Sequence, residues 1–195
     1  ITDGDFDHAD PAWSPDGSRV VFVTARHNSR DTDNAQAIVV TDVSRLGDGR
    51  ADTYVSSTIM TAVGPCAFPA WSPDGSRIAF TGHVYPTDTG RHTRVWVVSA
   101  SGGHARAVAD PLDRNVAASN GARPTWTEDG TSIFFTVEDD GSTILVEAPR
   151  PDLRSRDGSD TLRIVLGGRR EVSAFAVTAG AASIVAVVST AGKPP

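Results

Sequence analysis

The sequence predicts an all-β fold built from repeated four-stranded sheets. The run Pro-Ala-Trp-Ser-Pro-Asp-Gly-Ser-Arg occurs twice, beginning at Pro11 and at Pro69, and a looser copy begins at Pro124. The copies start 58 and 55 residues apart, which is enough chain for one four-stranded sheet per repeat. No convincing amphipathic helix is found between them. This spacing is typical of the radial sheets, or blades, of a β-propeller.

Each copy predicts a strand end, a tight turn and a return strand. The tryptophan ends the first strand, and its indole is large enough to fill the space between adjacent blades. In the turn that follows, Pro fixes φ, Asp bonds nearby backbone and Gly accepts a positive φ. The return strands, Val20–Thr24 and Ile78–Thr81, are almost continuously apolar, which indicates sheets covered on both faces. The residues that carry this structural repeat are Trp13, Asp16, Gly17, Trp71, Asp74, Gly75, Trp126, Asp129 and Gly130.

Two further strands complete each predicted blade. In the first repeat they are Ala37–Thr41 and Thr53–Ser56, and in the second they are Val95–Val98 and His104–Val108. A degenerate fourth copy covers residues 172–189, where Phe175 stands in place of the tryptophan.

The whole chain, residues 1–195, is therefore predicted to be an incomplete β-propeller of about three full blades with partial blades at both ends. About four to eight blades are needed to close a ring, so a fragment of this kind should expose apolar end faces and bind a hydrophobic dye. The predicted units are the tail of a preceding blade at 1–8, full blades at 9–66, 67–121 and 122–171, and a partial blade at 172–195.

Composition excludes several classes of function. The net charge of −6 argues against a nucleic-acid surface, and no apolar run reaches the length of a membrane span. The histidines lack the spacing of metal ligands, so neither a metal nor another cofactor is expected. The single cysteine, Cys66, is expected in the core, and the cytoplasm is the expected compartment.

Repeats of the form Pro-x-Trp-Ser-Pro-Asp-Gly resemble those of TolB-type propellers and of the N-terminal propeller of prolyl oligopeptidase family serine peptidases. Residues 1–8, Leu112–Asn115 and Val172–Phe175 are similar to bacterial acylaminoacyl-peptidase-like members of that family. In those peptidases a C-terminal α/β-hydrolase domain carries a Ser, Asp, His triad, with the serine in Gly-x-Ser-x-Gly. That motif does not occur in these 195 residues, so no catalytic residue is expected in this chain.

The resemblance implies that the propeller covers the active site of a parent peptidase and admits only peptides that reach its cavity. The candidate substrate-binding residues are Asp113, Arg114 and Asn115, in the polar connection from Asp110 to Arg123. Arg114 could hold a peptide carboxylate and Asp113 an amine, although a merely solvated loop is the plain alternative. Family members often assemble, so a homo-oligomer of the parent enzyme is also implied.

Two charged insertions, His27–Asp33 and His83–His92, form a second candidate surface because they occupy equivalent places in successive repeats. Two other functions stay open. A TolB-like scaffold would bind a protein partner without catalysis. A propeller enzyme with its site on the axis would need carboxylates or metal ligands recurring at one blade position, and the recurring Asp is better explained by the turn.

Overall fold

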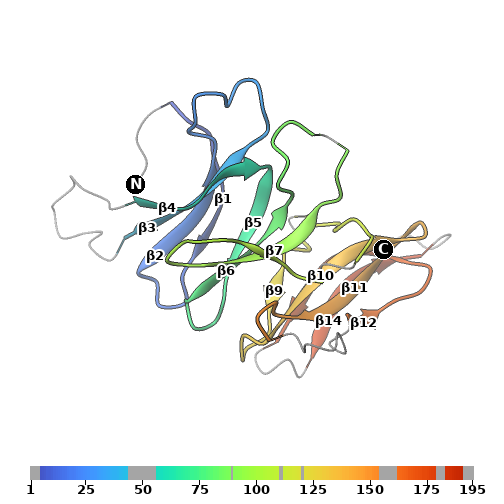
Figure 1. Ribbon diagram of the computed structural model, residues 1–195. Helices are drawn as coiled ribbons and strands as arrows, with labels where there is room; N and C mark the ends of the chain where they lie inside the picture. The colour runs from blue at the N-terminus through green and yellow to red at the C-terminus, as the bar shows by residue number, and fades with distance from the viewer. Residues whose placement is uncertain are drawn as a thin grey trace.

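The computed structural model describes residues 5–43, 56–88, 90–109, 112–119, 121–153, 162–178 and 183–190. Across these ranges the chain forms fourteen β-strands and no helix, which confirms the all-β prediction. The strands form three sheets that stand side by side along the chain (Figure 1). No sheet closes on itself within the described ranges, and the arrangement is that of a propeller-like domain.

The first two sheets are four-stranded meanders in which each strand pairs with the next one along the chain. The first contains β1 (His8–Trp13), β2 (Arg19–Thr24), β3 (Gln36–Asp42) and β4 (Ser56–Gly64), and the second contains β5 (Cys66–Trp71), β6 (Arg77–Gly82), β7 (Arg94–Ser99) and β8 (Arg106–Ala107). The third contains β9 (Thr125–Trp126), β10 (Ser132–Asp139), β11 (Ser142–Pro149) and β12 (Arg163–Leu166), and it also includes β13 (Glu171–Val177) and β14 (Ile184–Ser189).

The degenerate fourth copy forms the antiparallel hairpin of β13 and β14. The hairpin joins the third sheet through one parallel pair, Thr143 with Glu171. The Thr178 amide donates to the Ser183 carbonyl over 3.0 Å, as Ser14 does to Arg19 in the first copy over 2.8 Å. The turn bonding is therefore retained, although residues 179–182 lie outside the described part of the chain.

Of the predicted outer strand Thr53–Ser56, residues 53–55 lie outside the described part of the chain, and Ser56 belongs to β4. The outer strand of the first sheet continues from Ser56 to Gly64. Pairing with β3 sets these limits, because Thr41 faces Ser56 at one end and Gln36 faces Gly64 at the other. The sequence alone could not show that register.

The outer strand predicted at His104–Val108 is shorter than expected, since β8 covers Arg106–Ala107 alone. The Val108 amide still donates to the Val95 carbonyl over 2.8 Å. Ala109 then adopts a positive φ of 50°, which turns the chain away from the sheet.

The three Asp-Gly turns share one hydrogen-bonding pattern. Asp74 accepts the Ser72 hydroxyl at 2.6 Å and the Ser76 amide at 3.0 Å, and Gly75 has a φ of 66°. The Ser72 hydroxyl, the Ser76 amide and the Ser76 hydroxyl together lower the pKa of Asp74 to about 2. Asp16 and Asp129 bond in the same way, so all three carboxylates stabilise their turns in the ionised form.

The tryptophans connect neighbouring sheets. The indole of Trp71 donates to the Ala12 carbonyl over 3.1 Å, and the indole of Trp126 donates to the Ala70 carbonyl over 3.0 Å. The Arg19 guanidinium lies over the Trp71 ring at 4.6 Å from its centroid. Trp13 lies in the first of the described sheets, and 60% of its surface is exposed.

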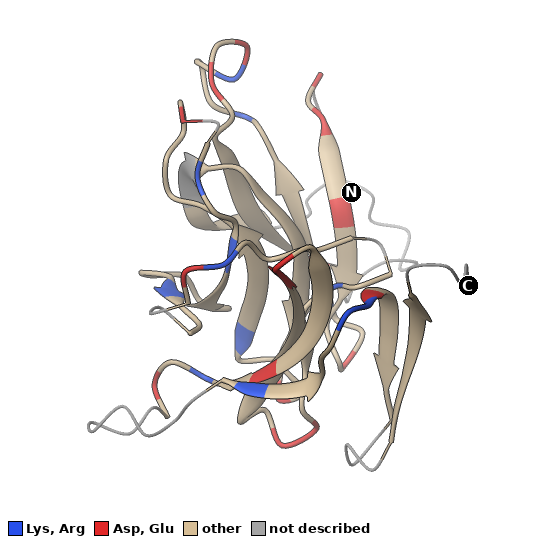
Figure 2. Ribbon diagram, turned by 90° about the vertical axis from the view of Figure 1, so that its right-hand side faces the viewer, with Lys and Arg blue, Asp and Glu red and all other residues tan. Residues whose placement is uncertain are grey.

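Apolar side chains fill the spaces between sheets. Val21 and Ile38 of the first sheet pack with Trp71 and Phe80 of the second, and Val95 of the second packs with Phe135 of the third. Charged residues lie mostly in the loops and at strand ends (Figure 2). Strands β2, β6 and β10 are largely buried, so the loops between strands are exposed and available to contact ligands.

Candidate functional site

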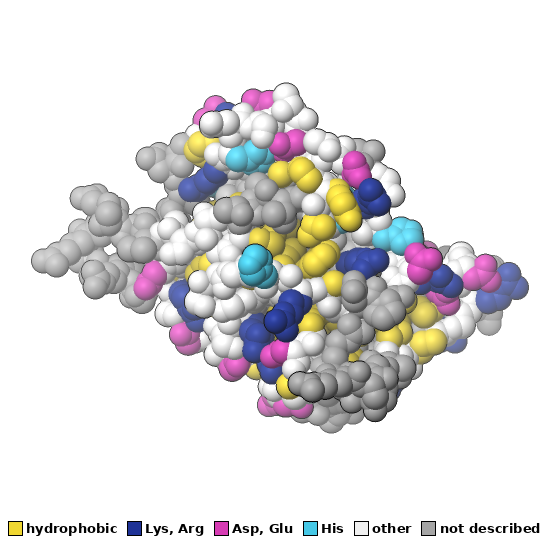
Figure 3. All heavy atoms as spheres, viewed as in Figure 1, with side chains coloured by type: hydrophobic (Ala, Val, Ile, Leu, Met, Phe, Trp, Pro, Cys, Tyr) yellow, Lys and Arg dark blue, Asp and Glu magenta, His cyan; other side chains and the backbone are white. Residues whose placement is uncertain are grey.

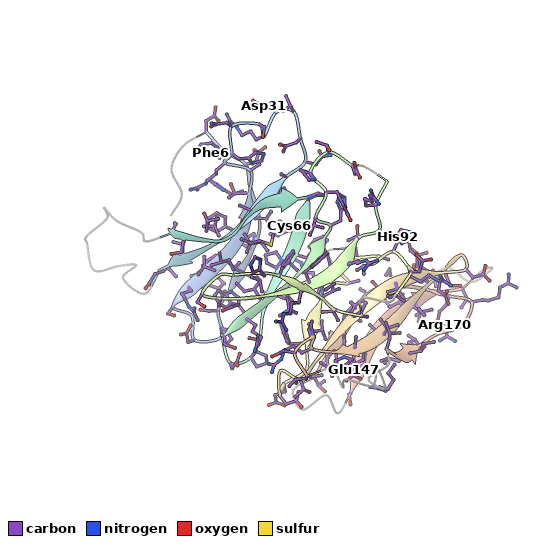
Figure 4. The ribbon with its side chains drawn as sticks, in the orientation of Figure 1. Phe6, Asp31, Cys66, His92, Glu147 and Arg170 are labelled. Atoms are coloured by element: carbon purple, nitrogen blue, oxygen red, sulfur yellow. The ribbon has the colours of Figure 1, made fainter. Side chains whose placement is uncertain are left out.

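Four connections lie together at one end of the sheets, and we call this surface the loop face. It consists of residues 25–35 between β2 and β3, 83–93 between β6 and β7 with Thr89 not described, 112–119 before β9, and 138–143 at the β10–β11 hairpin. Asp31 lies in the first of these segments and His92 in the second (Figure 4). The Asp-Gly turns are at the opposite ends of the strands.

The two charged insertions contact each other. The Asn34 amide donates to the Pro86 carbonyl over 2.9 Å. A cavity of about 480 Å³ is lined by both segments, including Arg30, Asp33 and His83. The second candidate surface of the sequence is therefore continuous across two neighbouring sheets.

Hydrogen bonds to Asp33 hold the first insertion in shape. His27 Nε2 lies 2.8 Å from Asp33 Oδ1, and the Ala35 amide donates to the same carboxylate over 2.9 Å. A hydrogen bond from Ser29 is the main reason why the pKa of Asp33 is lowered, followed by those from Ala35 and His27. The loop thus presents a fixed carboxylate.

Asn115 joins the second insertion to the third sheet. Its side-chain oxygen accepts the Thr93 amide over 2.9 Å, and its own carbonyl accepts the Glu138 amide over 2.9 Å. These bonds satisfy backbone groups of two segments that are far apart in sequence. Of the three candidate residues, Asn115 therefore has an evident structural role.

Arg114 is held by the β10–β11 hairpin. Its Nε donates to Asp139 over 2.9 Å and its Nη1 donates to the Asp113 carbonyl over 2.8 Å, while half of the side chain stays exposed. The hydrogen bond and the charge of Asp139 raise the pKa of Arg114. The guanidinium is therefore oriented before any ligand arrives, although its partly exposed ion pair contributes little to stability.

Asp113 is the most exposed of the three candidate residues. Its side chain is 91% exposed, and the Nδ1 of His92 lies 3.5 Å from its carboxylate. Asp113 and Arg114 are thus opposite charges beside each other on the loop face. The sequence suggested this pair, but it gave no sign that Asp139, His92 and Thr93 surround it.

No group of three or more His, Cys, Asp or Glu side chains suited to a metal ion occurs in the part of the chain that the structure describes. None of the described segments forms a helix long and apolar enough to cross a membrane. Cys66 is buried, as expected for a core cysteine, and burial raises the pKa of its thiol to about 12.

Comparison with curated proteins finds a sequence relative that is a peptidase by name. The chain is 27% identical over 128 residues to the uncharacterized peptidase YuxL of Bacillus subtilis (strain 168), a match that covers 66% of this chain and 17% of the relative. No protein-family model matches the chain. The chain therefore spans less than a fifth of the length of that relative.

Solved structures share the fold. A puromycin-hydrolyzing peptidase of Mycobacterium tuberculosis matches with a TM-score of 0.66 at 18% identity, over 94% of this chain and 28% of that one. TolB from Acinetobacter baumannii matches with a TM-score of 0.62 at 18% identity, over 96% of this chain and 39% of that one. At such identity these likenesses establish the fold alone. The chain thus has the propeller-like fold shared by TolB and by the propeller domains of prolyl oligopeptidase-type peptidases, and one of its curated relatives is an uncharacterized peptidase.

Proposed function

We propose that this chain is the propeller portion of a prolyl oligopeptidase family serine peptidase, of the acylaminoacyl, dipeptidyl or oligopeptidase type. In this proposal it restricts access of peptides to a Ser, Asp, His hydrolase domain. The observation that carries the proposal is the likeness to a peptidase in sequence, combined with a loop face on which four connections converge. A fold match alone would not suffice, because TolB shares the fold.

The proposed architecture has about three full blades, formed by the sheets that begin at β1, β5 and β9, and a partial blade at β13–β14. Its support is the repeated Trp, Asp, Gly turn and the indole bonds between successive sheets. The parent enzyme is proposed to be cytoplasmic and to form a homo-oligomer, and neither a metal nor a nucleic acid is part of the proposal.

Arg114 and Asp113 are proposed to hold the peptide on the loop face. Arg114 offers an oriented guanidinium, which suits a peptide carboxylate, and the exposed Asp113 suits an amine. Asn115 holds the two in place through Thr93 and Glu138. The pair would therefore act on binding of the peptide, and the bond cleavage itself would belong to the hydrolase domain.

The test is Arg114→Ala in the full-length protein, with kcat/KM measured on short peptides with a free carboxyl terminus. We expect a fall of about tenfold, which corresponds to loss of about 1.4 kcal/mol of binding, carried mainly by KM. Arg163→Ala is the matched control, since Arg163 is also an exposed arginine paired with an acid, Glu147, but lies on β12. An unchanged kcat/KM for Arg114→Ala would contradict the proposed role.

A scaffold propeller that binds a protein partner without catalysis is the second candidate, and the match to TolB favours it. The two candidates differ in reactivity towards a serine-directed fluorophosphonate. A peptidase is labelled by the reagent on a single serine and loses its activity. A scaffold is not labelled, whatever its fold.

A further inference from the structure

Two adjoining cavities lie beside Trp96, and His92, whose Nδ1 is 3.5 Å from the Asp113 carboxylate, lines the second of them. The first has a volume of about 460 Å³ and the second about 440 Å³, and the two share His83, Val84 and Trp96. We call this continuous hollow the Trp96 groove. Figure 3 shows hydrophobic side chains exposed in the middle of this view of the molecule, with histidine and basic side chains around them.

The first cavity is mainly apolar and its shape is fixed. Ile59 and Met60 of β4 line it from the first sheet, and Phe80 and Trp96 line it from the second. The Trp96 indole donates to the Gly82 carbonyl over 2.9 Å, which fixes the orientation of the ring. An apolar side chain could enter this space without rearrangement of the sheets.

The second cavity is basic and aromatic. Arg91, His92, Arg94 and Tyr85 line it, and the Arg91 guanidinium lies over the Tyr85 ring at 4.3 Å from its centroid. The Arg91 Nε donates a hydrogen bond to the Asp88 carboxylate over 2.9 Å, which orients the guanidinium. Asp88 is not one of the residues that line this cavity. Tyr85 and Val84 are 45% and 40% exposed, so the cavity is open to solvent.

The charge of the lining differs from that of the chain. Among the residues that the structure describes, no aspartate or glutamate lines either cavity, although the chain as a whole carries a net charge of −6. Arginine, histidine and aromatic side chains therefore gather here beside an apolar space. Arginine pairs with carboxylates through two parallel hydrogen bonds, which suits an anion at this end.

We infer that the Trp96 groove binds an apolar group that carries a carboxylate, such as the C-terminal residue of a peptide with an apolar side chain. The apolar side chain occupies the space between Ile59 and Trp96, and the carboxylate lies near Arg91 and Arg94. Each cavity has a volume typical of a small-ligand site. This inference goes beyond the proposed function, because it concerns binding by this chain and needs no catalytic domain.

The test is calorimetric titration of the full-length protein with N-acetyl-Leu-Phe, which has a free carboxylate, and with its C-terminal amide. We expect the acid to bind about tenfold more tightly than the amide, and Arg94→Gln to remove most of that difference. Val84→Glu places a carboxylate at the exposed rim and should weaken binding of the acid more than binding of the amide. Arg163→Gln, on β12, is the matched control and should change neither Kd.

A carboxylate next to an apolar group can belong to a peptide C-terminus or to a free aromatic acid. Titration with a third ligand, 3-phenylpropanoate, distinguishes these two sources. Tighter binding of the dipeptide indicates a peptide terminus, and equal binding indicates a free aromatic acid. Equal affinity for the acid and the amide, or an unchanged preference in both Arg94→Gln and Val84→Glu, would overturn the inference. These outcomes are independent of the fluorophosphonate and Arg114→Ala tests, because they measure binding and not hydrolysis.

Discussion

The indole nitrogen of Trp71 donates a hydrogen bond to the carbonyl oxygen of Ala12 in the neighbouring sheet, over 3.1 Å. Trp126 repeats this bond to Ala70 one repeat later. A side chain that recurs in the sequence thus makes the same contact with the sheet before it each time. Trp13, in the first of the described sheets, is instead 60% exposed.

Trp71→Phe should lower the free energy of unfolding by about 1–3 kcal/mol, because the Ala12 carbonyl loses its hydrogen-bond donor and the buried ring loses part of its volume. Trp13→Phe is the matched control and should change stability by less than about 0.5 kcal/mol. Urea denaturation of the two variants measures the difference. Equal effects would mean that the interface bond contributes nothing.

Acid should weaken the Asp-Gly turns. The folded pKa of Asp74 is about 2, below its ordinary value of 3.8, so its contribution to stability is complete above about pH 4 and is lost as the pH falls through about 2. Asp74→Asn should therefore reduce the loss of stability between about pH 4 and about pH 2. Urea midpoints measured across that range test this, with Asp31→Asn in an exposed loop as the control. If the urea midpoint of Asp74→Asn falls over this pH range as much as that of the unsubstituted protein, the prediction is contradicted.

The Cys66 thiol should be unreactive in the native protein. Burial raises its pKa to about 12, so almost none of it is thiolate near neutral pH. Reaction with a disulfide reagent should become fast only after unfolding in urea. Val84→Cys, at a 40% exposed position, supplies a reactive comparison. Rapid native labelling of Cys66 would show that the thiol is accessible.

Asn115→Ala should loosen the loop face. The Thr93 amide loses its acceptor at 2.9 Å, so its hydrogen exchange should accelerate, with a loss of stability of about 1 kcal/mol. Asn28→Ala, at an exposed position of another loop, is the control. Unchanged exchange at Thr93 would mean that the backbone holds this loop without the side chain.

The outer face of the β13–β14 hairpin should bind a hydrophobic dye. Val185 and Val187 are 67% and 48% exposed, next to each other on one face of the edge strand β14. Val185→Lys with Val187→Lys should reduce dye fluorescence and self-association of the 195-residue chain. A monomeric chain that melts cooperatively and binds no dye would contradict the prediction that the end faces are exposed.

The sequence predicted the repeated strands and turns because their signals are local. Trp, Pro, Asp and Gly act within a few residues of one another, so one copy already specifies its turn. The continuation of β4 to Gly64 was missed because pairing with β3 determines it, and the join between β13 and β11 depends on one distant pair. Which residues pair between two strands depends on the folded arrangement of the whole sheet, and local sequence does not determine it.

The candidate site was only partly predictable. Asp113, Arg114 and Asn115 stood out as polar residues in a long connection, but their partners Thr93 and Asp139 lie 22 and 25 residues away along the chain. The Trp96 groove was not predicted, because Ile59, Trp96 and Arg91 belong to three separate segments that only the folded chain brings together. The spacing of these residues in the sequence does not indicate that they lie together in the folded protein.

Reading the coding DNA in frame past residue 195 tests the central proposal most directly. The account predicts further blades followed by a hydrolase domain with Gly-x-Ser-x-Gly, then Asp and His in that order. A reading frame that closes the ring of blades and stops would contradict it, and would make the protein a binding propeller.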